Sequence, residues 1–327
     1  MKKSLPLLSL LTVGLIFGGP VDSVKTSALA AGHGKKVSWN LSTWGKRRAF
    51  TEGIEAVSAY VADKSDGHFT IKINYGGTLS KPRENLDGIS LGAFEAATFC
   101  ASYHADKNKA VTVLELPFLP ITNGDVQKAA DLAVYNHPAT IKEMKKWNAK
   151  LLMSAALPQY EFMGRGKEPR TLADFKGMRV RALGGIGKAM KVIGAVPTTV
   201  TAPETYRAIE TGTVDAAAFA FYSHFSYKIN EVSTWRTTNL SPGSVNCPMV
   251  VNIDAYNSLS DKNKKILTDA VDAGYSALFK AYSASIDKYT PVAEKQGIKK
   301  ITYTSGELDA FRKAAAQPVS DQGLNTA

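Results

Sequence analysis

Apolar and polar residues alternate most regularly between residues 176 and 222. Residues 178–182 predict a short strand that carries Arg179 and Arg181 on one face. After it the pattern predicts, in order, an apolar helix over 188–193, a strand over 195–200, a helix that begins near Pro203 and ends at Gly212, and an apolar strand over 214–219. Strands that alternate with helices in this way are typical of a parallel α/β sheet with right-handed crossovers.

The first part of the chain carries a separate unit of the same kind. Its expected strands cover residues 35–42, 68–75 and 94–100, and its expected helices cover 50–61 and 82–92. Farther along we expect helices over 125–135 and 138–148, strands over 150–157 and 247–253, a long helix over 260–296, a strand over 298–304 and a helix over 306–315. Ser260 is a suitable cap for the long helix, and Pro291 is expected to kink or break it.

Arg181 is the main candidate for a binding residue. It ends a strand inside an apolar unit, where a charge is costly unless it is paired. Ligands of open α/β sheets bind at the carboxyl ends of strands, and a guanidinium can hold a carboxylate through two parallel hydrogen bonds. The alternative is a structural ion pair with Asp215 or Glu204. Arg165, at the expected crossing into the second domain, is a further candidate or a solvated side chain.

Aromatic residues cluster after the strand over 214–219. The cluster contains Phe219, Phe221, Tyr222 and Phe225. Such residues pack in a core or line a pocket, and Phe219, at the strand end, is suited to a pocket wall. Three more aromatic residues stand at the edges of predicted elements and carry the same two interpretations: Trp44, Tyr103 and Tyr160.

Charge and motifs argue against other classes of function. The formal net charge is +11, but the lysines are scattered, which is typical of a solvated surface rather than of a nucleic-acid-binding face. The histidines form no metal-binding pattern, and no nucleophile motif is present, so we expect no catalytic set, metal or cofactor. Residues 183–187 resemble a phosphate-binding loop only loosely, and their glycines are expected to allow a close backbone approach.

Residues 1–31 have the features of a secretory signal peptide. Lys2 and Lys3 precede an apolar run over 5–19, and Ala28 and Ala30 form a small-residue cleavage site. The alternative is a retained anchor, but the run is shorter than the ~20 residues of a membrane span. We therefore expect an exported mature protein that is not embedded in the membrane.

The chain contains two cysteines, Cys100 and Cys247. An exported protein can join such a pair in a disulfide. Both cysteines lie in apolar runs, however, and this favours two buried, unpaired thiols. We expect unpaired thiols.

Residues 171–219 resemble the substrate-binding proteins of tripartite ATP-independent periplasmic (TRAP) transporters. The motifs that carry the resemblance are Asp174-Phe-Lys-Gly177, Arg181, Gly194-Ala-Val-Pro197, Glu204-Thr-Tyr206-Arg-Ala-Ile209 and Gly212-Thr-Val-Asp215. Weaker similarity covers the rest of the mature chain, including the two-proline turn over 116–120 and the long C-terminal helix.

The resemblance implies a periplasmic receptor with a two-lobed periplasmic-binding-protein fold, in which hinge strands and a long C-terminal helix join two mixed βα domains. We assign residues 35–158 plus 247–286 to lobe I and residues 159–246 plus 287–327 to lobe II. It also implies that Arg181 binds the carboxylate of a small organic acid, and that the receptor delivers this acid to a TRAP membrane permease. The ligand-binding set we expect is Arg181, Arg165, Phe219, Tyr222, Tyr103, Trp44 and Tyr160.

The chain departs from the family pattern at Ala218 and Phe219, where many relatives carry glutamate followed by asparagine or tryptophan. A metal-bridged ligand and a sialic-acid-type specificity are therefore not expected. The apolar pair predicts instead a monocarboxylate with an apolar or aromatic body. Two alternatives to a transport receptor remain: an exported α/β enzyme that acts on a small organic acid, and a receptor that presents its ligand to a membrane sensor.

Overall fold

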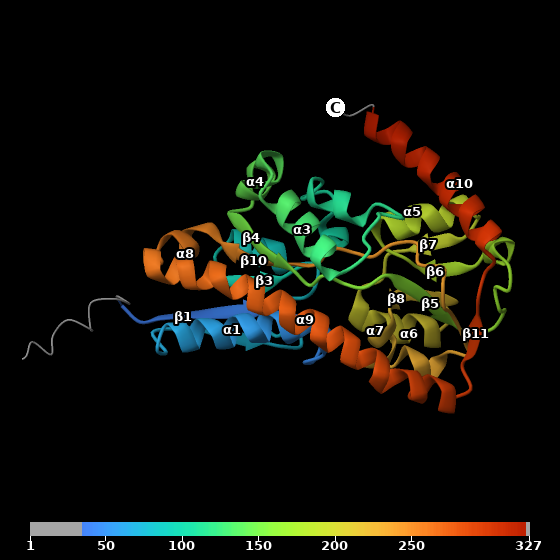
Figure 1. Cartoon of the computed structure of the whole chain (residues 1–327), viewed down its shortest axis with the longest axis horizontal. Helices are drawn as coiled ribbons and strands as arrows, with labels where there is room; N and C mark the ends of the chain where they lie inside the picture. The colour runs from blue at the N-terminus through green and yellow to red at the C-terminus, as the bar shows by residue number, and fades with distance from the viewer. Residues whose placement is uncertain (1–34, 325–327) are drawn as a thin grey trace, which may run out of the picture. The chain divides into compact units, whose positions relative to one another are not determined.

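A computed structural model describes residues 35–324, so the predicted signal peptide at 1–31 lies outside the described residues. The described strands form two mixed sheets (Figure 1). None of the helices in this part of the chain is both long and apolar enough to cross a membrane.

The first sheet has the order β2-β1-β3-β10-β4. Its strands are β1 (Val37–Ser42), β2 (Phe69–Asn74), β3 (Ala96–Thr98), β4 (Ala149–Ser154) and β10 (Pro248–Asn252). β1 is parallel to β2 and β3, whereas β10 is antiparallel to both of its neighbours. The helices of this region are η1 (Ala49–Thr51), α1 (Glu52–Lys64), α2 (Asn85–Ser90), η2 (Ala101–His104), η3 (Val111–Glu115), α3 (Gly124–Tyr135), α4 (Pro138–Lys145) and α8 (Ile253–Asn257).

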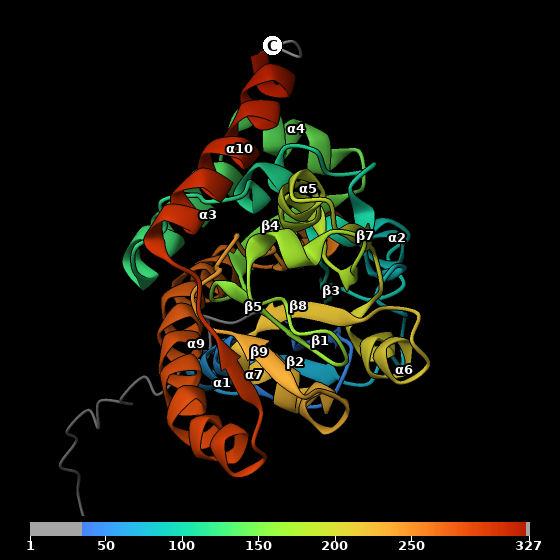
Figure 2. The ribbon, with the colours of Figure 1, turned by 90° about the vertical axis from the view of Figure 1, so that its right-hand side faces the viewer.

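The second sheet has the order β11-β9-β5-β8-β6-β7. Its strands are β5 (Tyr160–Gly164), β6 (Arg179–Arg181), β7 (Val196–Thr198), β8 (Ala216–Ala220), β9 (Trp235–Thr237) and β11 (Lys299–Ile301). The helices around it are η4 (Leu172–Phe175), α5 (Gly184–Val192), η5 (Ala202–Glu204), α6 (Thr205–Glu210), α7 (Phe221–Ser226), η6 (Ile229–Val232) and α10 (Ser305–Leu324). Helix α5 covers one face of the sheet, and α6 and α7 cover the other (Figures 1 and 2).

The two sheets share one design. In the first sheet, β1 lies between β2 and β3, and the antiparallel strand β10 follows β3. In the second sheet, β6 lies between β7 and β8, and the antiparallel strand β5 follows β8. The chain passes between the sheets at residues 155–159 and again at 238–247. The predicted α/β class with hinge strands is confirmed, while the residue boundaries of the two lobes stay a prediction.

Helix α9 (Asp261–Lys295) runs along both regions, packing on α1 near the first sheet and on α7 near the second (Figure 1). The side chain of Ser260 caps it by accepting a hydrogen bond from the Asn263 amide. A Cβ at Gly274 would lie 2.6 Å from the sulfur of Met153, so only glycine fits this close approach. Of the two effects predicted for Pro291, the break is wrong, because the helix continues to Lys295, while the kink stays a prediction. Pro291 is exposed, so water can satisfy the carbonyl that loses its helical partner.

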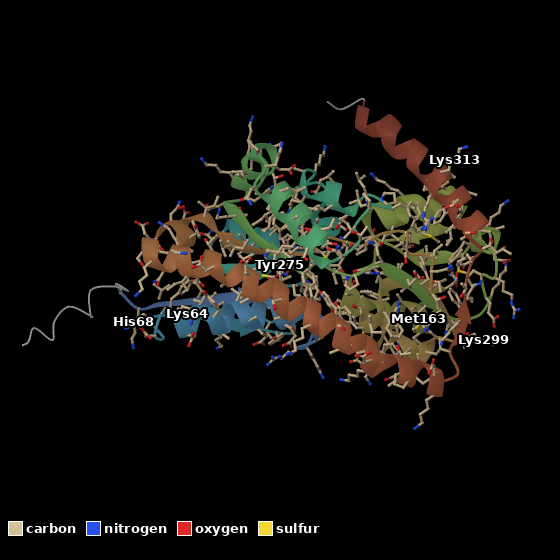
Figure 3. The ribbon with its side chains drawn as sticks, viewed as in Figure 1. Lys64, His68, Met163, Tyr275, Lys299 and Lys313 are labelled. Atoms are coloured by element: carbon tan, nitrogen blue, oxygen red, sulfur yellow. A yellow bond between two sulfur atoms is a disulfide. The ribbon has the colours of Figure 1, made fainter. Side chains whose placement is uncertain are left out.

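The scattered lysines lie on the surface, as the sequence predicted. Lys64, Lys299 and Lys313 stand at the periphery (Figure 3). Several surface lysines pair with nearby carboxylates, as Lys299 does with Glu168 at 2.6 Å. Pairs of this kind are screened by water and contribute little to stability.

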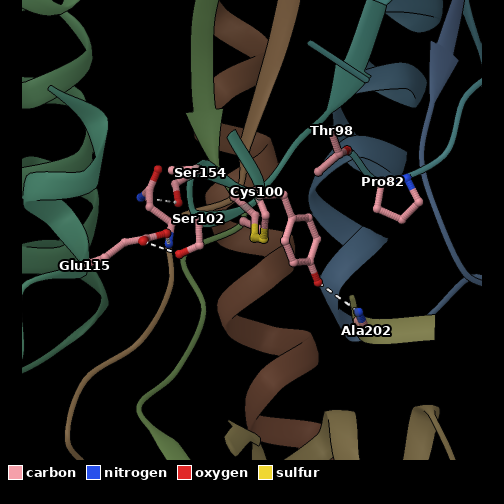
Figure 4. Close-up of a disulfide and its surroundings, with 12 residues drawn as sticks. Pro82, Thr98, Cys100, Ser102, Glu115, Ser154 and Ala202 are labelled. Atoms are coloured by element: carbon pink, nitrogen blue, oxygen red, sulfur yellow. Dashed lines mark hydrogen bonds between the residues drawn. A yellow bond between two sulfur atoms is a disulfide. The ribbon is translucent and has the colours of Figure 1, made fainter. Parts of the chain in front are cut away.

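The two cysteines form a disulfide, so the expectation of unpaired thiols is wrong (Figure 4). β3 and β10 pair with Met249 opposite Thr98, and continuing this register places Cys247 opposite Cys100. The flanking backbone bonds Phe99 N–H to Pro248 O and Ala101 N–H to Asn246 O keep the two chains together. Apolar surroundings could not reveal this pairing, because the two cysteines are 147 residues apart and only the sheet register brings them together.

Removing the disulfide should destabilise the protein. A cross-link that closes a loop of this length restricts the unfolded chain, so we expect Cys100→Ser/Cys247→Ser to lower the free energy of unfolding by roughly 2–5 kcal/mol. Urea unfolding with and without dithiothreitol measures this. The reductant should destabilise the wild-type protein but not the double variant, and equal stabilities of the two proteins under oxidising conditions would contradict the expectation.

Candidate functional site

The carboxyl ends of β3, β6 and β8 face a small enclosed cavity. Its volume is about 20 Å³, roughly the space for one water molecule. The lining residues are aromatic, cationic or small, and none is acidic: Trp44, Arg48, Phe50, Cys100, Tyr103, Leu157, Tyr160, Arg181, Ala202, Phe219, Tyr222, Ser223, Tyr227, Val245 and Cys247. Six of the seven predicted site residues are therefore brought together, and Arg165 is not.

Arg181 is the last residue of β6, where it pairs with Ala217 on β8 and Thr198 on β7. Its side chain is only 1% exposed. The Nε atom donates to Val200 O at 3.1 Å, one terminal nitrogen donates to Ala218 O at 2.6 Å, and the other donates to the Tyr103 hydroxyl at 3.3 Å. These bonds fix the plane of the guanidinium.

The structural ion pairs considered for Arg181 do not form. Asp215 binds Arg179 instead, at 2.5 Å, near the amino end of the same strands. Glu204 caps the turn at Thr201 by accepting hydrogen bonds from its amide and hydroxyl. No carboxylate in the described part of the chain forms an ion pair with Arg181, so its buried charge has only neutral partners. Such a charge is costly and attracts an anion.

Tyr103 connects the two sides of the cavity. It lies in η2, next to the first sheet, and its hydroxyl accepts hydrogen bonds from Arg181 and, at 2.8 Å, from the amide of Ala202 (Figure 4). Both donors belong to the region around the second sheet. The phenol oxygen therefore lies between two donors that also suit a carboxylate oxygen.

Aromatic rings form the cavity walls. The centroid of Phe219 lies 4.0 Å from the Arg181 guanidinium carbon, 6.2 Å from the Tyr160 ring and 5.7 Å from the Tyr227 ring, with Tyr227 stacked on it. Trp44 packs edge-on against Tyr103 at 6.0 Å from the opposite side. The chain turns from β8 into α7 directly after Ala220, and this turn presents Tyr222 to the cavity. These aromatic residues belong to the hydrophobic core and also line the cavity, so their contact with a ligand stays a prediction.

Arg165 lies at the other end of the second sheet. β5 runs antiparallel to β8, so Tyr160 faces Ala220 at the cavity end while Gly164 faces Ala216 at the far end. Arg165 follows Gly164, is exposed, and lies beside Asp215 and Lys167. The register therefore keeps this side chain away from the cavity, contrary to its predicted place in the binding set.

Sequence reasoning missed three cationic or aromatic lining residues: Arg48, Phe50 and Tyr227. Arg48 and Phe50 follow Trp44 in the turn after β1, and only the folding of that turn brings them to the cavity. Tyr227 stands four residues after Ser223, another lining residue, so the helical spacing after the strand could have indicated it.

A second contact across the cleft joins Glu115 to the start of α5. A Cβ on Gly184 would lie 2.3 Å from a carboxylate oxygen of Glu115, and one on Gly185 would lie 1.9 Å from its carbonyl oxygen. The glycine run was expected to precede a helix that starts at Lys188, but α5 begins at Gly184. The expected role of its glycines in a close approach is confirmed.

Two buried carboxyl groups are linked through Asn246. Its amide N–H donates to Glu115 at 3.0 Å, and its side chain donates to Asp131 at 3.0 Å. Burial raises the pKa of Glu115 to about 7, although hydrogen bonds from Ser102 and Asn246 act in the opposite direction. Burial likewise raises the pKa of Asp131 to about 7. Ser154, at the end of β4, also receives a bond from Asn246 (Figure 4). The hydrogen bonds of Asn246 thus connect the two segments near the cavity at which the chain passes between the sheets.

The remaining titratable groups near the cavity do not form a reactive centre. Burial lowers the pKa of His224 to about 3, and the nearby charge of Arg181 acts in the same direction, so this imidazole stays neutral. Within residues 35–324, no cluster of three or more histidine, cysteine or acidic side chains is arranged to hold a metal ion.

Comparison with known proteins gives a consistent result. A family model described as "Bacterial extracellular solute-binding protein, family 7" (DctP) matches residues 42–324. The ectoine-binding periplasmic protein TeaA of Halomonas elongata is 23% identical over 273 residues, which are 80% of this chain and 77% of TeaA. The monocarboxylate 2-oxoacid-binding periplasmic protein of Nostoc sp. is 24% identical over 316 residues, 91% of this chain and 85% of that protein.

Two solved structures have the same fold. A TRAP periplasmic solute-binding protein from Polaromonas sp., bound to D-erythronate, matches with a TM-score of 0.76 at 17% identity, covering 88% of this chain and 94% of that one. One from Desulfovibrio salexigens, with bound orotic acid, matches with a TM-score of 0.75 at 19% identity, covering 85% and 89%.

The raised pKa of Glu115 predicts a pH-dependent stability. The folded state retains a proton near pH 6 that the unfolded state releases, so this contribution is full below about pH 4.5 and is lost as the pH rises through about 7. Between pH 5 and 8, the free energy of unfolding should fall by up to about 3 kcal/mol more in the wild-type protein than in Glu115→Gln.

Urea unfolding at each pH measures this difference. His224 and Asp131 are present in both proteins, so their contributions cancel. The exposed Glu84→Gln is the matched control and should follow the wild-type curve. Parallel curves for the wild type and Glu115→Gln would contradict the predicted role of Glu115.

Proposed function

Because the chain belongs to family 7 of the bacterial extracellular solute-binding proteins, we propose that it holds a small organic acid by its carboxylate on Arg181 and delivers it to a TRAP permease. Family membership confirms the resemblance seen in the sequence and the expectation of a receptor rather than an enzyme. No observation favours the exported enzyme or the sensor-presenting receptor.

The position of Arg181 carries this proposal. Its guanidinium is buried, rigidly held and without an anionic partner among the described residues. The three bonds it makes leave N–H groups on both terminal nitrogens for a carboxylate. Hydrogen bonds to charged groups contribute on the order of 1.5–3 kcal/mol each, so a carboxylate here supplies a large part of the binding free energy.

Ligand entry requires the cavity to widen. Its volume of about 20 Å³ accommodates a water molecule but not an organic acid. The chain crossings at 155–159 and 238–247 are the segments about which the two sheets can separate. In this mechanism the walls separate, the acid binds Arg181, and the walls close over it.

The cavity walls suggest the kind of acid. Seven aromatic side chains and no acidic one line the site, which supports the predicted monocarboxylate with an apolar or aromatic body. The names of related proteins include 2-oxoacids, D-erythronate and orotic acid, all small acids.

The place of action is outside the cytoplasm, as the family description states. We further propose that the mature receptor works in the periplasm after cleavage of a signal peptide at residues 1–31, because this segment combines a basic start, an apolar run and a small-residue cleavage site. Amino-terminal sequencing of the exported protein tests this cleavage.

Replacing Arg181 by alanine should abolish tight binding, with a loss of at least about a hundredfold in affinity, because both hydrogen bonds and the charge that hold the carboxylate disappear. A thermal-shift screen over organic acids identifies the ligand, and calorimetry measures the affinity. Arg179→Ala removes an exposed arginine from the same strand and should bind like the wild type. Unchanged affinity of a folded Arg181→Ala protein would refute the proposal.

Removing the hydroxyl of Tyr103 should strengthen binding. In the closed structure this oxygen occupies donors of Arg181 and Ala202 that the ligand carboxylate needs, and one hydrogen bond contributes about 1 kcal/mol. We therefore expect Tyr103→Phe to bind the acid roughly fivefold more tightly by calorimetry. Tyr75→Phe, which removes a phenol outside the cavity, is the control. Weaker binding by Tyr103→Phe would show that the phenol contacts the ligand instead of competing with it.

A further inference from the structure

We propose that the cavity has a second polar end, formed by Arg48, Tyr222 and Tyr227, which binds an oxygen atom of the ligand far from its carboxylate. This distal site rests on the proposed function, because it assumes that Arg181 holds the carboxylate. It narrows the predicted monocarboxylate to one whose far end carries a hydroxyl or a carbonyl, and it replaces the monocarboxylate by a dicarboxylate if the far oxygen belongs to a carboxylate.

Arg48 supplies a cation without an acidic partner. One terminal nitrogen donates to Trp44 O at 2.9 Å and to Lys46 O at 2.8 Å, and no ion pair with a carboxylate forms within the described residues. The guanidinium carbon lies 4.5 Å from the Phe50 ring centroid and 5.3 Å from that of Tyr227. By contrast, the adjacent Arg47 pairs with Glu52 at 2.9 Å. The arginine that faces the cavity is thus the one left for an external acceptor.

Gly45 keeps the polar atoms of this end close together. A Cβ at this position would lie 2.9 Å from the terminal nitrogen of Arg48 and 3.2 Å from the hydroxyl of Tyr227. The backbone at Gly45 also has φ +70°, which favours glycine. The turn after β1 therefore leaves the guanidinium and the phenol on either side of one small residue.

The two tyrosine hydroxyls are buried and lack a partner. Tyr222 is 2% exposed, and neither its hydroxyl nor that of Tyr227 makes a hydrogen bond of ordinary geometry with a described residue, although Tyr222 lies near Ser223 and Tyr282, and Tyr227 near Trp44. Buried polar groups in folded proteins nearly always have a partner, so these two indicate one supplied by a ligand. Burial raises the pKa of Tyr222 to about 12, so its phenol remains protonated and can donate. Together, Arg48 and the two tyrosine hydroxyls supply hydrogen-bond donors at this end of the cavity, so the distal site selects an acceptor oxygen of the ligand.

A stack of rings separates the two cationic ends. Arg181 lies on Phe219, Phe219 stacks on Tyr227 with planes 20° apart, and Arg48 lies over Tyr227. A ligand that lies along these rings with its carboxylate on Arg181 points its other end toward Arg48. Arg48, Tyr222 and Tyr227 also line an outer groove of about 800 Å³, so the distal site stands where the inner cavity meets the groove. A longer ligand therefore has room beyond it.

Matched sets of acids test the distal site. Each set keeps one carbon skeleton and varies only the far end: butanoate, 4-hydroxybutanoate and succinate; pentanoate, 5-hydroxypentanoate and glutarate; 3-methylbenzoate, 3-(hydroxymethyl)benzoate and isophthalate. Calorimetry on the wild-type protein should show, in at least one set, an oxygen-bearing acid that binds at least about tenfold more tightly than its unsubstituted member.

Arg48→Gln and Tyr222→Phe should remove that preference, because each should weaken binding of the oxygen-bearing acid several-fold more than binding of the unsubstituted acid. Arg47→Gln, the adjacent exposed arginine, should retain it. Thermal unfolding checks that each variant is folded. If Arg48 and Tyr222 only maintain the structure of the turn and of α7, both variants will weaken all acids of a set alike, and that result overturns the proposal.

The outcomes separate this inference from the function on which it rests. If acids bind through Arg181 but no set shows a preference for the oxygen-bearing member, only the distal site is refuted. If no acid of the panel binds, or if Arg181→Ala binds them as the wild type does, the carboxylate receptor is refuted and the distal site with it.

Discussion

The structure of the cleft depends on one buried charge. Arg181 is almost fully enclosed, and its positive charge is balanced only by two backbone carbonyls, a phenol and the face of Phe219. These neutral groups hold the guanidinium in one orientation but compensate its charge incompletely. The guanidinium of Arg181 is thus a rigid cation at the point where strand ends meet. In the proposed function, a carboxylate that enters the cleft balances the charge of this guanidinium and accepts hydrogen bonds from its remaining N–H groups.

In the proposed mechanism, closure of the cleft relies on contacts that can be broken and remade. Tyr103 reaches from the first sheet to donors beside the second, and Glu115 packs on the first turn of α5. The disulfide lies in the cavity wall and ties β3 to β10, so it keeps this wall in one piece while the walls separate. Asn246 links Glu115 to Asp131 within the same region. The pKa values of both carboxyl groups are raised to about 7, so proton uptake near neutral pH acts on residues that pack beside the hinge segments.

Much of the candidate site was predictable because it follows a general rule of α/β sheets. Arg181 and Phe219 stand at the carboxyl ends of parallel strands, and this position can be read from periodicity. Arg165 lies away from the cavity because β5 runs antiparallel to β8, and strand direction is not contained in a local pattern; its role in binding stays a prediction. The prediction of unpaired thiols at Cys100 and Cys247 was wrong for a similar reason, since their pairing depends on the register between two strands distant in sequence. No local sequence pattern indicates that Arg48 lines the cavity, because its position results from the path of the turn after β1.

The sequence by itself determined most of the order of strands and helices, without β5, α7, β9 and α8, and it determined the α/β class, the family and the place of Arg181 at a strand end, because each follows from local periodicity or from a linear motif. Tertiary structure alone decided what surrounds Arg181: that Asp215 and Glu204 are engaged elsewhere, that Tyr103 crosses the cleft, and that Arg48 faces the same cavity. These are contacts between segments far apart in the chain. They arise from sheet register and side-chain packing, and a one-dimensional pattern records neither.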